Sequence, residues 1–528
     1  MVSGTGSPPL ADSLETVADH IYRTLAVHFP VCLSSDEFHF FPQYISQDRD
    51  WSRWDDFSPE SVAAVLEMMD EWQKSLDARR AEASLPEECV DLGMLIGMLG
   101  TLREQLDWGG GHKSQPTFYL TVAGIGLAEA LEAGDEAFRR RMATLPVLLD
   151  AAARNLPSPP RLFRDMGLRM ARSLKIWVRS LAAFGGPTIA GALESLDRFT
   201  RHLDTIPVTE EFRLSEEQYA RIAERHIGCR MNVGAIAGQL EAEIDGCRQE
   251  LETEAGRLSP GRRWQDVVKD LPAPDLSEGR HKALYQLVIS DLRSHCVQEG
   301  LATRRLANAS VVSIRDIPGY LRLVRSGAAF SMPPGHPPKG GTFFLMPEAP
   351  SVSLPADYRL LAAHETFPGH HLLDANRWAL QRPLRRPVEY PLFYEGWASF
   401  SEELLFDTGF FSGPVDRLLM AKRRFWRAVR GRTDLDIHAG WRSPDSAVAA
   451  LVHEGLPVTK AVAMVQRYAL KPGYQLSYTI GRRRFRDLFE SFIRGGGRRD
   501  GFVRGIMAEG EIDWDDLSGV LLSKGDES

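Results

Sequence analysis

The chain of 528 residues gathers metal-binding side chains in one short segment, His364-Glu365-Thr366-Phe367-Pro368-Gly369-His370-His371, and a second segment follows, Glu395-Gly396-Trp397-Ala398. Zinc in catalytic sites takes about three protein ligands, among them imidazole nitrogens and carboxylate oxygens, and keeps one position for water. Two histidines and a glutamate would supply that set. Glu365 follows the first histidine directly and could act as the general base toward an attacking water. A zinc hydrolase is therefore the leading hypothesis.

The spacing of the histidines does not suit a regular helix. The H-E-x-x-H motif places its histidines at i and i+4 on one helix face, but position i+4 here is Pro368. On an undistorted helix, His370 would lie about 240° around the axis from His364 and roughly 9 Å along it. His371 would return to the same face but roughly 10.5 Å along the axis, too far for two imidazoles that share one ion.

Pro368 and Gly369 predict how the chain resolves this conflict. Proline lacks an amide donor and clashes with the carbonyl four residues earlier, which belongs to His364, and glycine adopts backbone angles that other residues resist. We predict a local bulge that absorbs two extra residues and returns His370, rather than His371, to the place of an ordinary i+4 histidine. A purely structural role for this cluster is the alternative.

The motif H-E-x-x-P-G-H-H followed by E-G-W-A resembles the signature of a large bacterial family of metallopeptidase-like proteins, long catalogued as a domain of unknown function. Upstream, residues 317–322 and 341–347 are similar to stretches that precede the family's metal helix. Downstream, Arg430, Asp434 and His438 resemble the family's R-x-x-x-D-x-x-x-H block. Residues 467–481 resemble its R-Y…P…Q…S-Y…G block. The likeness extends from about Ile314 to Arg486.

This resemblance implies a gluzincin-like site, in which a glutamate on a second helix is the third ligand. Glu365 matches the general base, and His438 and Tyr478 match donors to the oxyanion that forms when water attacks a carbonyl. Loss of one such donor typically costs about 10²–10³ in rate. Both residues could instead be partly buried polar residues of the core. The implied ligands of one zinc ion are His364, His370 and Glu395.

Other charged residues are candidates for supporting roles. Arg467 could hold a substrate carboxylate through its planar guanidinium, with an ordinary salt bridge as the alternative. Glu402, Glu403 or Asp374 could orient the ligating imidazoles, as zinc-bound histidines usually require. The same three carboxylates could equally be solvated surface groups.

Almost all elements expected around these residues are helices. The run Thr342–Met346 is typical of a short strand, and through it Phe343 and Phe344 could contact an extended peptide that pairs with the strand edge; a small internal sheet is the alternative. Apolar residues recur at helical spacing in residues 14–26, 61–83, 88–106, 122–145, 162–184, 189–203 and 216–227. Residues 240–258 are expected to form a long charged helix, and residues 281–297 a further helix.

These patterns predict a mainly α fold: a large multi-helix body with two lobes around a central metal cleft and a very small β-sheet or hairpin. A stretch rich in Pro, Asp and Gly, residues 259–279, marks a loop or junction. We expect an N-terminal helical region, 1–257, and a C-terminal metal-binding catalytic region, 258–528, within one continuous body.

Composition restricts the partners and the compartment. A net charge of -8 argues against nucleic acid, because phosphates require a basic surface. The sequence contains no run of about 18 apolar residues, the length needed to span a membrane. Residues 1–9 lack the basic region and apolar stretch of a secretory signal. Five scattered cysteines without a C-x-x-C pair argue against a disulfide scaffold. We expect a cytoplasmic protein, and the sequence leaves its oligomeric state open.

The expected activity is zinc-dependent hydrolysis of an amide bond, with Glu365 passing the proton of the water to the leaving amine. Short peptides are the favoured substrates, by analogy with helical peptidases, although analogy of fold is weak evidence for a substrate. One alternative is a hydrolase of a non-peptide amide or a small metabolite conjugate. Another is a non-catalytic metal- or peptide-binding protein. Cobalt or manganese could also occupy such donors.

Overall fold

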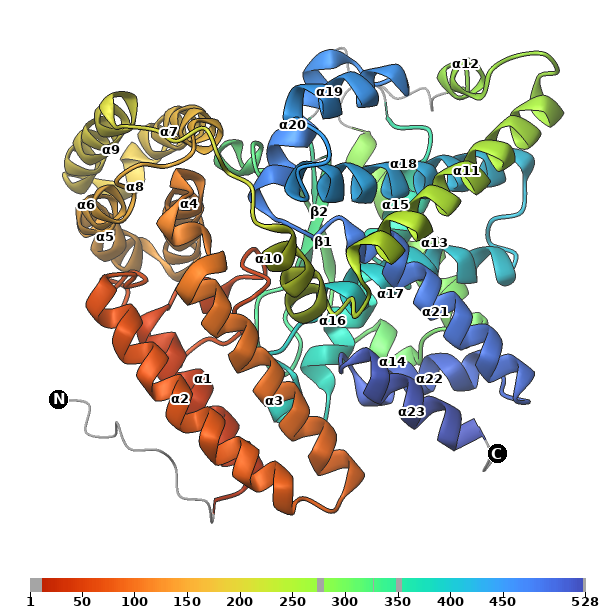
Figure 1. Ribbon diagram of the computed structural model, residues 1–528, viewed down its shortest axis with the longest axis horizontal. Helices are drawn as coiled ribbons and strands as arrows, with labels where there is room; N and C mark the ends of the chain where they lie inside the picture. The colour runs from red at the N-terminus through yellow and green to blue at the C-terminus, as the bar shows by residue number, and fades with distance from the viewer. Residues whose placement is uncertain (1–11, 273–279, 326, 348–353, 526–528) are drawn as a thin grey trace.

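The computed structural model describes residues 12–272, 280–325, 327–347 and 354–525. Within these residues the fold is mainly α-helical with one small sheet (Figure 1), which confirms the predicted fold class. The amino-terminal residues 1–9 and part of the predicted junction, residues 273–279, lie outside the described residues. No described helix is both long and apolar enough to cross a membrane.

The first nine helices lie together on the left of Figure 1, and all of them except the four-residue α8 contribute residues to one apolar core. The helix expected over residues 122–145 is divided at Gly134, whose positive φ of 121° ends one helix before the next begins. The helices are α1 (Leu14–His28), α2 (Pro59–Glu82), α3 (Pro86–Glu104), α4 (Pro116–Ala133), α5 (Asp135–Ala143), α6 (Leu145–Asn155), α7 (Arg161–Ser180), α8 (Ala182–Gly185) and α9 (Thr188–Thr205).

The remaining helices form a second group on the right of Figure 1. Helices α13 to α18 and α21 to α23 supply most of a second large apolar core, whereas α19 and α20 contribute to a separate one with α11, α12 and α18. The members are α10 (Glu216–Arg221), α11 (Val233–Leu258), α12 (Trp264–Lys269), α13 (His281–Gln298), α14 (Arg304–Ala307), α15 (Tyr358–Glu365), α16 (His370–Ala379), α17 (Pro391–Asp407), α18 (Pro414–His438), α19 (Pro444–His453), α20 (Val458–Leu470), α21 (Leu476–Arg494), α22 (Arg499–Glu509) and α23 (Trp514–Gly525).

Two helix pairs dominate the packing of this second group: α11 lies along α18, and α17 lies along α21. Helix α11 precedes the expected boundary at residues 257 and 258, yet it packs with the C-terminal helices. The second group of helices therefore begins earlier in the chain than the Pro/Asp/Gly-rich stretch, residues 259–279, indicated. Helices α15 to α18 and α21 position the candidate metal-binding residues.

The sheet consists of β1 (Val312–Asp316), β2 (Ala328–Ser331) and β3 (Gly341–Leu345). The predicted strand is β3, and it is the central strand, parallel to β1 and antiparallel to β2. Both of its edges are therefore occupied, and the expected pairing with a peptide substrate does not fit.

The two aromatic residues of β3 also correct the expectation of a substrate contact. Phe343 is fully buried, 0% exposed, and its ring packs edge-on against Tyr285 with centroids 5.2 Å apart. Apolar burial of this kind stabilises the core and leaves no surface for a ligand. Phe344 is half-buried beneath the guanidinium of Arg325. It lines a cavity of about 1350 Å³ between the sheet and the N-terminal helices, and the candidate metal ligands are not among that cavity's lining residues.

Candidate metal centre

The helix that contains His364 breaks where proline and glycine predict a distortion. Helix α15 ends at Glu365, and α16 begins at His370. Across the break, the Gly369 amide donates to the Ala363 carbonyl at 3.2 Å, and the Leu372 amide donates to the Thr366 carbonyl at 3.1 Å. These hydrogen bonds reach back six residues instead of four. The predicted insertion of two extra residues is thus confirmed.

Gly369 is required at this break because the backbone passes very close to it. A Cβ at this position would lie 1.9 Å from the carbonyl oxygen of His364. The indole of Trp397 on α17 donates to the Pro368 carbonyl at 2.9 Å. The tryptophan of the E-G-W-A motif therefore ties the second helix to the break in the first.

The glycine of the same motif brings α17 close to α21. A Cβ on Gly396 would lie 2.7 Å from the Cα of Gly481, so any larger side chain would separate the two helices. This contact sets the distance between Glu395, one residue earlier on α17, and the tyrosines near the start of α21.

His364, His370 and Glu395 lie together, all three buried, with one ligand atom from each within 4.8 Å of the others. The Oε2 atom of Glu395 lies 3.4 Å from Nε2 of His364 and 3.3 Å from Nε2 of His370. Two atoms bound to one zinc ion at about 2.0–2.2 Å and at the tetrahedral angle lie about 3.3–3.6 Å apart. The residues present thus fit a zinc site in both chemistry and spacing.

The imidazole of His364 is oriented by a carboxylate behind it. Glu402, fully buried on α17, lies 3.1 Å from His364 Nδ1. For the Nε2 lone pair to face the cluster, Nδ1 must bear the proton and donate it to Glu402. Arg423 and Arg427 hold Glu402 in turn. Nη2 of Arg427 also lies 3.1 Å from His364 Nδ1, but because a guanidinium only donates, a protonated Nδ1 pairs with Glu402. Burial and Arg427 lower the pKa of His364, but hydrogen bonds to Glu395 and Glu402 raise it more, and the net shift is upward.

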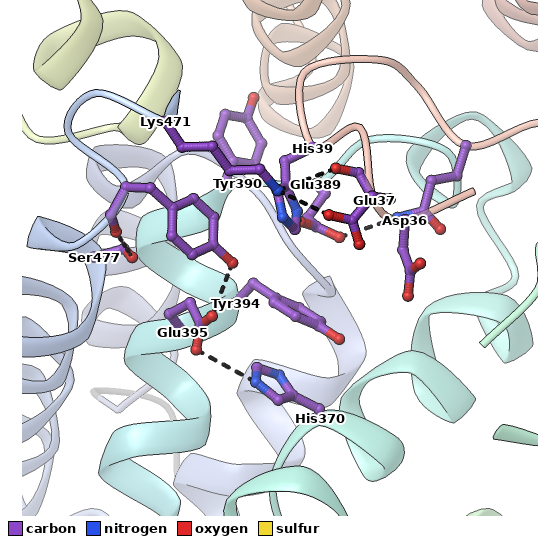
Figure 2. A network of polar contacts seen from close by, with 12 residues as sticks. Asp36, Glu37, His39, His370, Glu389, Tyr390, Tyr394, Glu395, Lys471 and Ser477 are labelled. Carbon is purple, nitrogen blue, oxygen red and sulfur yellow. Dashed lines mark hydrogen bonds and ion pairs between the residues drawn. The ribbon is translucent and has the colours of Figure 1, made fainter. Parts of the chain in front are cut away.

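The imidazole of His370 is held by ring stacking. Its plane lies 21° from that of Tyr394, with centroids 4.1 Å apart, and Figure 2 shows the ring pointing to Glu395. The Tyr394 hydroxyl donates to Asp374 at 3.1 Å. Burial raises the pKa of Asp374 to about 7. Asp374 therefore supports His370 through Tyr394.

Glu395 is held by a residue that the sequence analysis did not single out. The Tyr474 hydroxyl donates to Glu395 Oε1 at 2.8 Å and leaves Oε2 for the cluster. The Tyr474 ring lies 4.7 Å from that of His39, which belongs to the N-terminal half of the chain. Burial alone would raise the pKa of Glu395, but the imidazoles of His364 and His370 hold it well below the ordinary value. Glu395 is therefore ionised, as a metal ligand must be.

Glu365 lies beside this cluster with its carboxylate unengaged. The side chain is 6% exposed, and no hydrogen bond or ion pair involves its carboxylate among the described residues. Its oxygens are not among the fully buried polar atoms that lack a partner, so they keep some contact with solvent. Such a group can accept a proton without first breaking another bond.

Tyr478 also lies at the cluster, as expected from its motif. Its ring stacks on His364 with centroids 6.2 Å apart, and the hydroxyl reaches Glu395. Burial raises the pKa of this phenol well above its ordinary value, so Tyr478 keeps its proton and remains a donor.

His438 has different surroundings from those of the cluster. Its Nε2 donates to the carbonyl of Tyr468 at 3.1 Å, and the ring stacks on Tyr219. Burial lowers the pKa of His438 to about 4, so the imidazole is neutral near pH 7. Asp434, one helical turn earlier, accepts from the amides of Gly473 and Gln475 at 3.0 Å each and fixes the turn that contains Tyr474. These contacts are those of a hydrogen-bonded core residue, and the catalytic role of His438 stays a prediction.

The other candidate residues from the sequence are His371, Glu403 and Arg467. His371 lies outside the cluster, between the rings of Phe330 and Phe367, and contacts Ser310 at 3.3 Å. Glu403 pairs with Arg482 and Arg486 and not with a ligating imidazole. Arg467 is half-buried and forms no ion pair with the described residues, so the salt bridge considered for it is not present there.

Two residues that hold the cluster, Arg427 and Tyr474, were missed from the sequence. Arg427 lies one turn before Arg430 on the same helix, and Tyr474 follows the turn Pro472-Gly473. The turn-forming dipeptide just before the S-Y motif was the available signal, but it predicts a turn and not the direction of the tyrosine.

The chain belongs to a family of bacterial proteins of unknown function, DUF885, whose sequence model matches residues 44–499. No sequence among the curated proteins matches it.

Two solved structures are similar along almost their full length. One, from Shewanella oneidensis, has a TM-score of 0.76 at 15% identity and covers 97% of this chain and 100% of its own. The other, from Colwellia psychrerythraea, has a TM-score of 0.77 at 16% identity and covers 98% and 99%. Each is described as a "putative lipoprotein". At these identities the likeness establishes the fold alone.

Proposed function

We propose that this protein is a zinc-dependent hydrolase of amide bonds, a peptidase that acts on short peptides. The observation that supports the proposal is the spacing of His364, His370 and Glu395, whose ligand atoms suit a tetrahedral ion, beside the unpaired carboxylate of Glu365. Zinc bound by these residues would supply a Lewis acid for the carbonyl and would lower the pKa of an attacking water to about 7.

The residues of the chain then have distinct tasks. Glu365 takes the proton from the attacking water and delivers it to the nitrogen of the leaving amine. Tyr478, which keeps its proton, donates to the oxygen that becomes negative when water adds to the carbonyl. Glu402 holds the proton on Nδ1 of His364 and so preserves the tautomer that binds metal.

The substitution Glu365→Gln tests the proposal. Because the carboxylate has no partner among the described residues, the change should leave folding and zinc content unaltered. Turnover of a mixed peptide pool should fall by about 10²–10⁴, the usual contribution of a general base. Glu490→Gln, on the exposed face of α21, is the matched control and should keep full activity. Near-normal rates in Glu365→Gln would exclude this residue as the base.

The wild-type protein separates the competing functions. Chelator-sensitive cleavage of peptides supports the peptidase. Cleavage confined to non-peptide amides or metabolite conjugates supports the first alternative, and zinc binding without turnover of either class supports a binding protein.

The expected cytoplasmic location stays a prediction. The two similar structures are each described as a "putative lipoprotein", and at 15% and 16% identity that description is not carried over to this chain. Fractionation of cells that express the full-length gene, followed by detection in the soluble and membrane fractions, tests this point.

A further inference from the structure

Two arginines beside the candidate metal centre lack carboxylate partners. Arg430 on α18 and Arg467 on α20 take part in no ion pair among the described residues. Arg430 is exceptional on its own helix, because its neighbours there are paired with carboxylates. Those neighbours are Arg417, Arg423, Arg424, Arg427 and Arg432.

The polar atoms around these arginines include buried donors without acceptors. The Nε atom of Arg430 and the hydroxyl of Tyr468 are both buried, and neither has a hydrogen-bond partner. Buried donors without partners are rare in folded proteins, because such groups lose their hydrogen bonds to water and gain none in return. These two donors lie near the guanidinium of Arg467, which also has no ion-pair partner among the described residues. The arrangement suits an acceptor that comes from outside the chain.

The charge of this region is positive although the chain as a whole is acidic. Burial lowers the pKa of Arg467; Tyr468 opposes this shift and the nearby charge of Arg430 adds to it, so Arg467 lies near both residues. Lys460, which is exposed, lies near both arginines. Lys422 and Asp357 also lie near Lys460. Asp357 is already paired with Lys422 and Arg423. A positive group of this kind attracts an anion.

Arg430 lies within reach of a peptide bound at the metal centre. The guanidinium carbon of Arg430 lies 4.5 Å from the ring centroid of Tyr478, and that ring stacks on His364 at 6.2 Å. Taken end to end, these two distances correspond to about three residues of extended chain. An anion held by Arg430 would therefore belong to a residue no more than about three positions from the bond at the metal.

We propose that Arg430, Arg467 and the Tyr468 hydroxyl bind the terminal carboxylate of a peptide substrate, so that the protein releases short pieces from the C-terminal end. This inference rests on the proposed function. A guanidinium binds a carboxylate through two parallel hydrogen bonds. The terminal carboxylate is the anion that every unmodified peptide has, and it always lies on the leaving-amine side of the cleaved bond. An acidic side chain is the other source of the same chemistry.

Binding to zinc-loaded Glu365→Gln protein, measured by calorimetry, tests the proposal without turnover. The probes are acetyl-Ala-Phe-Ala-Ala with a free C-terminus, the same peptide as its amide, and acetyl-Ala-Phe-Ala-Glu amide. We expect the free acid to bind at least about 10-fold more tightly than its amide, since hydrogen bonds to charged groups contribute about 1.5–3 kcal/mol. In the added variants Arg430→Gln and Arg467→Gln this preference should fall to about twofold or less, with affinity for the amide unchanged. Arg417→Gln, which alters a paired arginine of α18, should keep the preference.

The outcomes distinguish this proposal from the proposed function. Equal affinity for acid and amide, or no binding of either, overturns the carboxylate site, and this comparison needs no arginine variant. Tight binding of only the glutamate amide assigns the site to acidic side chains and overturns the terminal assignment. Failure of the wild-type protein to cleave peptides would overturn the peptidase but would not alter the binding result. In an active protein, the arginine variants should raise KM for free-acid peptides more than they lower kcat.

Discussion

The hydrogen bond from Tyr474 to Glu395 allows a quantitative prediction about zinc affinity. The substitution Tyr474→Phe removes one hydroxyl and retains the ring that packs on His39. A hydrogen bond to a charged group contributes about 1.5–3 kcal/mol. At 1.4 kcal/mol for each factor of ten, zinc binding should weaken by about 10- to 150-fold. The loss of partners that orient metal ligands in other proteins costs about 10–100-fold, which agrees with this range.

Competition with a chromogenic chelator measures the dissociation constant directly. Tyr219→Phe is the matched control, because it removes a buried hydroxyl that has no hydrogen-bond partner in the structure. This control should bind zinc as the wild-type protein does. A dissociation constant for Tyr474→Phe within twofold of the wild-type value would refute the assignment of Tyr474 as the residue that holds Glu395.

Two further predictions follow from histidines of the same region. His370→Ala should lose zinc on metal analysis, whereas His371→Ala should retain it and lose stability, because His371 fills a space between aromatic rings; the reverse ranking would contradict the choice of ligand. The free energy of unfolding should fall as pH drops from about 6.5 to about 4, because the unfolded chain protonates His438 near 6.5 while burial lowers the folded pKa to about 4. The change of the unfolding free energy with pH that His438 contributes should reach about 1.4 kcal/mol per pH unit. Urea melts of His438→Gln at several pH values should lack this contribution. The same pH dependence in both proteins would exclude His438 as its source.

Local distortion of the chain was predictable because its causes are neighbours in the sequence. Pro368 cannot donate an amide hydrogen bond, and Gly369 permits the close approach to the His364 carbonyl, so the break follows from residue types alone. The same reasoning selected His370 over His371. The helices were predictable because burial of one helix face imposes a regular apolar period, and the main error there, at residues 122–145, came from a single glycine.

Pairing across the fold was not predictable in the same way. An apolar alternation identified β3 as a strand but did not indicate that β1 and β2 would occupy both of its edges. It also could not reveal that Phe343 would point into the core. Among the three carboxylates considered as partners of the imidazoles, only Glu402 contacts one directly, and nothing local distinguishes it from Glu403 beside it.

Residue types and their order along the chain are enough to predict the chemistry of the centre and the backbone break that lets two histidines on one segment approach each other. These depend on covalent geometry and on contacts between residues close along the chain. The meeting of Glu395 with Tyr474, and the absence of carboxylates beside Arg430 and Arg467 among the described residues, depend instead on contacts between distant segments. Those outcomes depend on how closely helices such as α17 and α21 pack, and a helical period shows which face is buried but not what lies against it.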